Sequence, residues 1–408
     1  MKSTGVIEVA AREARLKKKL RAHLRELGFS RAADGLLVPP AMDKETYRKV
    51  HAHQRASKLE ENGKWIAAHA PKLIRHFASG ADIDVPAIRP RLELAPGGSK
   101  EGDLFRLASM NWRIPVSEGY GRRLRFLVWD ENNGKLIGLI ALGDAVFNLR
   151  ARDAVIGWDH LRRKEALVHL MDAYVLGAVP PYNTLLGGKL VASLVRSSEI
   201  VKAFDEKYRD SVGVISQRQK KARLVAVTTS SALGRSSMYN RLALGGRRIF
   251  EPIGYTSGWG HFHISDGLFE EFRSYLSYLK DPYADAFSFG QGPNWRIRLI
   301  KRALSHLGME PNLIQHGMTR EVFLCTMASN AKEFLRGDHV RVRYGNLPSV
   351  AEVARMAMER WVIPRAHNRP EYMSWRAEQF MEELAQPALA MQQTPTVQEA
   401  LWTGHATN

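Results

Sequence analysis

Cysteine is nearly absent from this sequence, because Cys325 is the only one among 408 residues. A single thiol excludes an intramolecular disulfide framework and a cysteine-based zinc cluster, and it is typical of proteins of the reducing cytoplasm. Cys325 lies in the apolar run VFLCTM, so we expect a buried structural thiol rather than a nucleophile.

Long hydrophobic runs are missing as well. No apolar stretch approaches the roughly 20 residues that a helix needs to cross a bilayer. The N-terminal sequence MKSTGVIEVAAREARLKKKL lacks the apolar core and cleavage site of a signal peptide. We therefore predict a cytoplasmic protein without a membrane partner. The histidines between residues 43 and 79 have no acidic or cysteine companions at ligand spacing, so we predict no metal site.

Acidic residues are scarce relative to basic ones. The chain has 60 Lys and Arg against 42 Asp and Glu, which gives a formal net charge of +18. Such an excess attracts polyanions and favours a nucleic-acid partner. Otherwise the hydrophobic content of 45% and the charged content of 25% are those of a globular protein. The length exceeds that of a usual single domain, so we expect two or three domains.

Composition and periodicity divide the chain into four predicted parts. Residues 1–100 form a basic helical region that ends in a Pro- and Gly-rich linker, and residues 104–265 form an α/β domain. Residues 266–385 form a mostly helical basic region. Residues 386–408 contain no Lys or Arg and are expected to be a flexible tail.

The predicted α/β domain begins with a hairpin. RLRFLVWD and KLIGLIALGD flank the turn that contains Asn133 and Gly134, which is a strong hairpin signal. Further strands are expected from Leu167, within 221–231 and within FEPIGYTSGWGHFHI. Together these segments predict a mixed sheet with flanking helices.

The stretch from Leu167 to Val195 carries the main functional signal. It reads as a buried strand, a turn with Pro180 and Pro181, a loop that closes on two glycines, and an amphipathic helix. The first amides of a helix lack intrahelical partners, and the helix dipole favours negative charge. A strand that leads through a loop into such a helix therefore predicts an anion site.

These motifs resemble known families. VPPYNTLLGGKL is similar to the loop pattern V-x-P-x-x-R-x-x-G-x-G of the acyl-CoA N-acyltransferase (GNAT) superfamily, and SSMYNRLALGG…IFEPIGY resembles its YxxxGF ending. More closely, IGWDHLRRKEALVHL together with the loop resembles the A-protein family of the Druantia anti-phage defence system. The resemblance implies a GNAT-like sheet and a role in anti-phage defence or DNA modification.

The resemblance also implies roles for particular residues. In the superfamily a strand bulge polarises the thioester carbonyl, loop amides hold the pyrophosphate, a carboxylate or His deprotonates the amine, and a Tyr protonates the thiolate. Tyr239 would be the acid, Asp172 and His169 would be candidate bases, and Leu176 to Pro180 would form the bulge and the start of the loop. Acetyl-CoA or another acyl donor would be the cofactor, and the implied cofactor-binding residues are Val179, Asn183, Gly187, Gly188 and Lys189.

Two loop positions depart from the superfamily pattern. Asn183 stands where Arg or Gln is usual, and Leu186 stands where the first Gly is expected. A side chain at position 186 hinders the close approach of a pyrophosphate to the backbone. A phage enzyme of the same superfamily, resembling Mom of phage Mu, modifies adenine in DNA without ordinary acyl-CoA behaviour, and an altered loop on a basic protein fits that precedent.

Basic residues near aromatic ones suit contact with a nucleic-acid backbone together with base stacking. HVRVRYGN alternates Val and Arg like an exposed strand. No sequence-reading motif is present, so binding would be electrostatic and salt-dependent, with DNA favoured over RNA. The predicted nucleic-acid contacts are Arg247, Arg248, Arg296, Arg298, Lys301, Arg302, Arg341 and Arg343.

Three functional hypotheses remain open at this point. The first is a nucleic-acid-directed GNAT-fold transferase that modifies a base or an amine, alongside partner proteins of a defence system. The second is a non-catalytic module on the same fold that binds DNA or a partner. The third is an acetyl-CoA-dependent acetyltransferase of a protein or a small amine.

Overall fold

The computed structural model describes residues 2–33, 36–40, 43–114, 116, 121–210, 212, 219, 221–261, 263–284 and 295–385. The chain forms two compact units. The helical unit contains Met1–Ser57, Ala232–Gly234 and Thr256–Arg320, and the sheet unit contains Lys58–Ser231, Arg235–Tyr255 and Glu321–Asn408. None of the described helices combines the length and the apolar character that a bilayer crossing requires.

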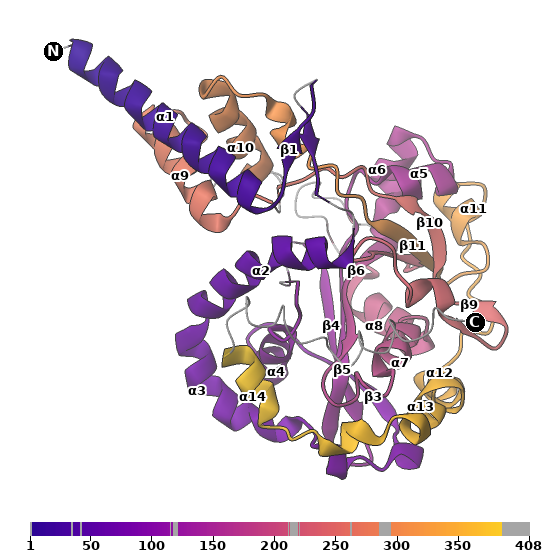
Figure 1. Cartoon of the computed structure of the whole chain (residues 1–408). Coiled ribbons are helices and arrows are strands. Elements are labelled where there is room, and N and C mark those ends of the chain that lie inside the picture. Colours follow the sequence, from indigo (N-terminus) through magenta and orange to yellow (C-terminus); the bar gives the residue numbers. More distant parts are fainter. Residues whose placement is uncertain are drawn as a thin grey trace, which may run out of the picture. The chain divides into compact units, whose positions relative to one another are not determined.

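The helical unit is built on an amphipathic N-terminal helix. The leucine stripe of α1 (Lys2–Glu26) is buried at Leu16, Leu20, Leu24 and Leu27, as its spacing predicts. It packs with α9 (Asp266–Tyr278) and α10 (Trp295–His306), which lie beside it in Figure 1. The unit also contains β1 (Ser30–Arg31), β2 (Leu37–Val38), η6 (Pro311–Ile314) and most of α2 (Lys44–Glu61).

The sheet unit is built on a seven-stranded mixed sheet. Its strand order is β10-β11-β7-β6-β5-β4-β3, and β6 and β7 are its one parallel pair among the described strands. The strands are β3 (Pro90–Leu94), β4 (Arg123–Asp130), β5 (Lys135–Asp144), β6 (Leu170–Ala178), β7 (Ala226–Ser230), β10 (Glu251–Tyr255) and β11 (Glu321–Thr326). The predicted mixed α/β architecture is therefore present.

Helices cover both faces of the sheet (Figure 1). One face carries α7 (Gly187–Leu194), α8 (Ser198–Tyr208) and α12 (Val350–Ala357). The other face is covered at one end by α3 (Gly63–Leu73), α4 (Lys100–Ser109) and α14 (Gln379–Ala385). At its other end lie α5 (Arg150–Ile156), α6 (His160–Ala166) and α11 (Ala331–Arg336). The parallel strands, where the predicted site lies, thus have helices on both faces of the sheet, while Asp172 of β6 stays partly exposed.

Short elements complete the sheet unit. β8 (Ala243–Leu244) and β9 (Arg247–Arg248) pair as a small ribbon, and α13 (Ile363–Asn368) continues α12. The remaining single turns are η1 (Ile74–His76), η2 (Gly80–Asp82), η3 (Val85–Ala87), η4 (Leu167–His169), η5 (Tyr239–Arg241), η7 (Met358–Val362) and η8 (Pro370–Ser374).

The structure differs from the sequence expectations at several places. The predicted linker at 80–103 contains edge strand β3, which pairs with β4, and the sheet gains β11 from beyond residue 265. The Val-Arg alternation of 339–346 is not a strand, because it lies against Asn330 rather than a neighbouring strand. A proline inside a helical pattern usually ends the helix, but Pro364 sits in the first turn of α13, where its missing N–H is tolerated. The four-part division stays a prediction, and the expected tail at 386–408 lies outside the described residues.

Candidate functional site

Strand β6 carries an irregularity close to the predicted site. Leu142 of β5 pairs with Ala173, but Ala141 pairs with Val175, so Tyr174 is an extra residue on β6. A bulge of this kind re-aims side chains and is common beside functional sites. The bulge was expected within Leu176 to Pro180, but β6 keeps regular pairing with β5 through Ala178, and only the start of the loop lies in that range.

The loop after β6 is closed by its own backbone. The Pro180–Pro181 peptide bond is cis. The amides of Asn183, Thr184, Leu185 and Gly187 donate to the carbonyls of Val179, Pro181 and Tyr182 at 2.9–3.1 Å. Val179 is fully buried and its amide donates to the Ile137 carbonyl. Most of the amides that the sequence offered as an anion cradle therefore have partners within the loop.

Tyr182 fastens this loop to the β4–β5 hairpin. Its hydroxyl donates to Asp130 Oδ2 at 2.9 Å and accepts from Asn133 Nδ2 at 2.9 Å. Both the Tyr182 ring and Asp130 are almost fully buried, so the pair replaces water with fixed partners. Burial and the charge of Asp130 raise the pKa of the Tyr182 hydroxyl, which keeps it a donor.

The start of α7 combines a strained residue with two different glycines. Leu186, the residue before the helix, has a left-handed backbone with φ 59°. A Cβ on Gly187 would lie 2.5 Å from the Tyr182 carbonyl oxygen, whereas one on Gly188 would come no closer than 3.7 Å to Met238. Gly187 therefore serves close backbone packing, and Gly188 leaves space at the helix start.

Positive charge gathers around this helix start. Burial lowers the pKa of Lys189, and the charges of Arg241, Arg360 and Arg365 lower it further. None of the neighbouring charges that shift this pKa, among the described residues, is negative. Arg365 Nε also donates to the Thr184 carbonyl at 3.1 Å, which holds it against the loop. Anion binding here would thus depend on side-chain cations more than on loop amides.

Asp172 lies on β6 just before the bulge and is half-buried. Its Oδ1 accepts a hydrogen bond of 2.7 Å from the Thr228 hydroxyl on β7. Burial raises the pKa of the carboxyl, against the opposing effects of that hydrogen bond and of the Arg152 and Arg123 charges. A carboxyl with a raised pKa on a strand beside a bulge is a candidate general base.

The other two predicted catalytic residues are placed differently. Tyr239 packs on Phe323 of β11, and Phe323 pairs with Thr229 of β7. Asp172 pairs instead with Thr228, the residue before Thr229. Because successive residues of a strand project to opposite faces, Tyr239 and Asp172 lie on opposite faces of the sheet. Burial raises the pKa of Tyr239 to about 12. His169 Nδ1 accepts from the Arg223 amide at 3.0 Å, and burial lowers its pKa to about 4. The roles of these residues stay predictions.

The predicted nucleic-acid contacts fall into two groups. In the helical unit, Arg296 pairs with Asp266 and Arg302 with Asp281, while Lys301 lies 4.5 Å from the Trp259 ring and Arg298 is exposed. In the sheet unit four arginines are exposed, and their side chains form no hydrogen bond or ion pair with a described residue, namely Arg247, Arg248, Arg341 and Arg343.

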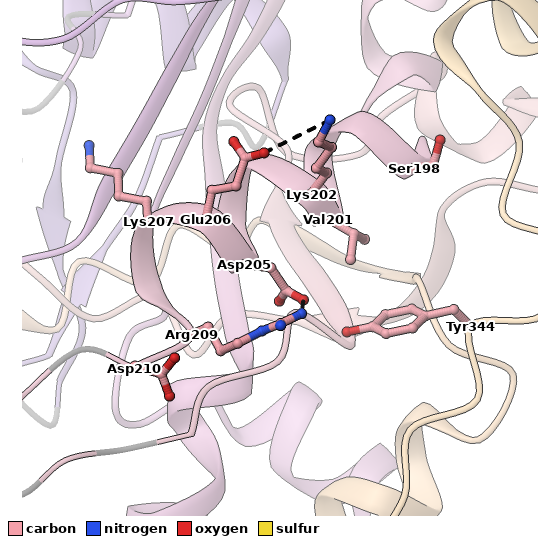
Figure 2. Close-up of a pocket in the computed structure, with 9 residues that line it drawn as sticks. All are labelled: Ser198, Val201, Lys202, Asp205, Glu206, Lys207, Arg209, Asp210 and Tyr344. Atoms are coloured by element: carbon pink, nitrogen blue, oxygen red, sulfur yellow. Dashed lines mark hydrogen bonds and ion pairs between the residues drawn. The ribbon is translucent and has the colours of Figure 1, made fainter.

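A pocket of about 720 Å³ opens on α8 of the sheet unit. Figure 2 shows Tyr344 reaching toward Asp205 and Arg209, which form an ion pair. The Tyr344 hydroxyl and Asp205 Oδ1 are buried without a hydrogen-bond partner among the described atoms. Lys202 and Glu206, also on its rim, are 3.9 Å apart. None of the predicted catalytic, cofactor-binding or nucleic-acid-binding residues lines this pocket.

No group of three or more His, Cys, Asp or Glu in the described part of the chain could hold a metal ion.

The fold and the candidate site define a basic α/β protein with a bulged central strand and a cationic helix start. Residues 41–337 match the model of the family described as Druantia protein DruA. The chain is also 51% identical over 384 residues to the Druantia protein DruA of Escherichia coli (strain UMEA 4076-1), covering 94% of this chain and 95% of that protein. The chain therefore belongs to the DruA family. No solved structure matches it.

Proposed function

We propose that this chain acts in anti-phage defence as a nucleic-acid-directed transferase that modifies a base or an amine on a GNAT-like sheet. Membership of the DruA family supports the defence role and a requirement for further proteins of the Druantia system. The net charge of +18 supports a nucleic-acid partner.

One observation carries the chemical part of the proposal: the bulge at Tyr174 directly precedes the loop and the cationic start of α7. The same order of bulge, loop and helix is what the superfamily resemblance implies. Lys189 would hold the phosphates of an acyl donor, and Asp172 would accept the proton of the attacking amine. An acyl donor such as acetyl-CoA would supply the group that is transferred.

Mass spectrometry of nucleosides tests this function. DNA from cells that express the chain with the other Druantia proteins should contain a modified nucleoside that is lost in Asp172→Asn. Tyr239→Phe tests the predicted acid in the same cells. Asp144→Asn serves as the control, since Asp144 is half-exposed and pairs with Arg122. A wild-type nucleoside profile identical to that of cells without the chain would refute the transferase.

Calorimetry with acetyl-CoA tests the donor separately. Binding that weakens about tenfold or more in Lys189→Gln would support an acyl-CoA site at α7, since a hydrogen bond to a charged group contributes about 1.5–3 kcal/mol. No heat of binding to the wild-type chain would exclude acetyl-CoA as the donor. It would also exclude the general acetyltransferase of proteins or small amines.

A second function is favoured by the closed loop. Its amides are bonded internally, and the sheet separates Tyr239 from Asp172. Both features suit a non-catalytic module that binds DNA or a partner protein. Phage protection that survives Asp172→Asn, together with an unchanged nucleoside profile, would support this second function over the first.

A further inference from the structure

An arginine that pairs with no carboxylate among the described residues lies on the same face of the sheet as Asp172. Arg123 of β4 pairs in register with Gly143 of β5, and Gly143 pairs with Asp172 of β6. Residues paired across strands project to the same face, with Cβ atoms about 5 Å apart. The three positions therefore form one row across β4, β5 and β6.

The Arg123 guanidinium is seated by its surroundings. A Cβ on Gly143 would come within 2.9 Å of Nη1, so the missing side chain leaves the seat that the guanidinium occupies. On its other side the guanidinium carbon lies 4.4 Å from the centre of the Tyr174 ring. Stacking on the aromatic ring, together with the space that the glycine leaves, fixes the position of an otherwise flexible side chain.

This fixed cation has unused hydrogen-bonding capacity. Its Nε is buried without a hydrogen-bond partner in the described part of the chain, and no described carboxylate lies within ion-pair distance of it. The charge of Arg123 lowers the pKa of Asp172, although the two side chains do not form an ion pair. The neighbouring Arg122 is the contrast, because it bonds Asp144 and two carbonyls. An unpaired guanidinium held in place suits a planar oxyanion, which it can contact through two N–H groups.

A second arginine extends the same surface. Arg125, two residues along β4, projects to the same face, and its Nε donates to the Tyr174 hydroxyl at 3.3 Å. Its guanidinium carbon lies 5.7 Å from the Phe105 ring, and it too has no described carboxylate partner. Tyr174 is the bulge residue of β6, so both cations are tied to the irregularity beside Asp172.

We propose that Arg123, supported by Arg125, binds a backbone phosphate of a nucleic-acid strand and so places a nucleotide next to Asp172. This site would recognise the acceptor, whereas the cations at α7 would hold a donor. The proposal rests on the proposed function for the identity of the acceptor, but binding can be measured without any donor or reaction. The alternative is that Arg123 only packs on Tyr174.

Fluorescence anisotropy with a short labelled single strand of DNA tests the site in the full-length chain. Arg123→Gln should weaken binding roughly 3- to 10-fold at low salt and reduce the slope of log K against log salt by about 0.7, the value for one phosphate contact on a single strand. Arg123→Lys should retain the slope, because it keeps the charge. Arg355→Gln is the control matched for net charge, since Arg355 of α12 pairs with Glu359 of η7, and α12 covers the other face.

A second variant guards against misfolding of Arg123→Gln. Gly143→Ala changes neither arginine, but its Cβ would occupy the space of the Arg123 guanidinium. It should therefore weaken DNA binding, as Arg123→Gln does. Calorimetry with coenzyme A separates the two sources of phosphate: Arg123→Gln should leave any coenzyme A affinity unchanged. Equal affinity and salt slope for wild type and Arg123→Gln would overturn the proposal, as would a wild-type chain that does not bind DNA. Normal Arg123-dependent binding with no modified nucleoside would retain this site and refute only the transferase.

Discussion

The Thr228 hydroxyl donates to Asp172 Oδ1 across the parallel pair of β6 and β7, at 2.7 Å. This bond joins the two strands where β6 is about to bulge, and it is the direct support of the candidate base. It favours the ionised carboxylate, whereas burial favours the protonated form, and burial has the larger effect on the pKa.

Replacement of Asp172 by Asn should stabilise the chain at neutral pH. With a raised folded-state pKa, the folded chain holds the proton to higher pH than the unfolded chain, whose value is near 3.8. Stability is therefore full below that value and falls as pH rises through the folded-state pKa. Asn removes this loss and can still accept from Thr228. A gain of about 1 kcal/mol would raise the melting temperature by roughly 2 °C.

Thermal unfolding at pH 4 and pH 7 measures this effect. The gain of Asp172→Asn over wild type should be present at pH 7 and shrink toward pH 4. Asp144→Asn should destabilise instead, since Asp144 accepts from both the Arg122 amide and its Nε. If Asp172→Asn lowered the melting temperature at pH 7, as is expected of Asp144→Asn, the ionised Asp172 carboxylate would stabilise the folded chain, which would contradict this prediction.

The adjacent glycines at the start of α7 should respond in opposite ways to alanine. Gly187→Ala places a Cβ 2.5 Å from the Tyr182 carbonyl oxygen, and such overpacking costs about 1–3 kcal/mol. Gly188→Ala meets nothing closer than 3.7 Å and should be neutral or stabilising by up to about 1 kcal/mol, because Ala has the higher helix propensity. Urea unfolding of both variants measures the difference, and equal midpoints would contradict the tight packing of the loop.

Much of the site could be predicted from turn residues and periodicity, because residues close together in the sequence form it. Asn133 and Gly134 predicted the hairpin turn, and Gly134 does have a left-handed backbone with φ 68°. Periodicity and the positions of Pro and Gly likewise predicted the strand, loop and helix from Leu167 to Val195, although the strand begins at Leu170, after the turn η4. Burial of Cys325 followed from its apolar neighbours and is confirmed.

Non-local pairings could not be predicted in this way. β11 enters the sheet between β10 and β7, although the helical-unit segment Thr256–Arg320 precedes it in the sequence. The alternation near Arg341 resembled a strand but has no partner strand among the described residues. The seat of Arg123 depends on a glycine of the neighbouring strand, so only the register of β4 and β5 reveals it.

Acid should destabilise the helical unit through three buried histidines. The side chains of His51, His263 and His316 are almost fully buried, and burial lowers their pKa values to about 4, about 4 and about 3. Positive neighbours, Arg320 among them, act in the same direction at His51 and His316. The unfolded chain takes up these protons near pH 6.5, so stability is full above that pH and declines toward pH 4.

The unfolding midpoint as a function of pH measures this decline, which each neutral histidine steepens by up to about 1.4 kcal/mol per pH unit. His316→Asn should reduce the steepness, because Asn does not titrate yet can still accept from the Met318 amide. His367→Gln is the exposed control and should leave the curve unchanged. A midpoint that is constant between pH 5 and pH 7 would show that these histidines are not held neutral.

Removal of exposed arginines should affect DNA binding more than removal of an ion-paired one. Arg247 and Arg248 form the exposed strand β9, and their side chains form no hydrogen bond or ion pair with a described residue, so they are available to phosphates. Arg302 Nε instead donates to the buried carboxylate of Asp281 at 2.7 Å. The double variant Arg247→Gln/Arg248→Gln should reduce the salt slope for a single strand by about 1.4, from two lost contacts.

Arg302→Gln should leave the slope nearly unchanged and lower stability by about 1 kcal/mol, because the arginine is half-exposed and His306 still bonds Asp281. Anisotropy titrations across salt concentrations, paired with urea unfolding, measure both quantities. A larger slope change for Arg302→Gln than for the double variant would place the nucleic-acid contact on α10 instead of β9.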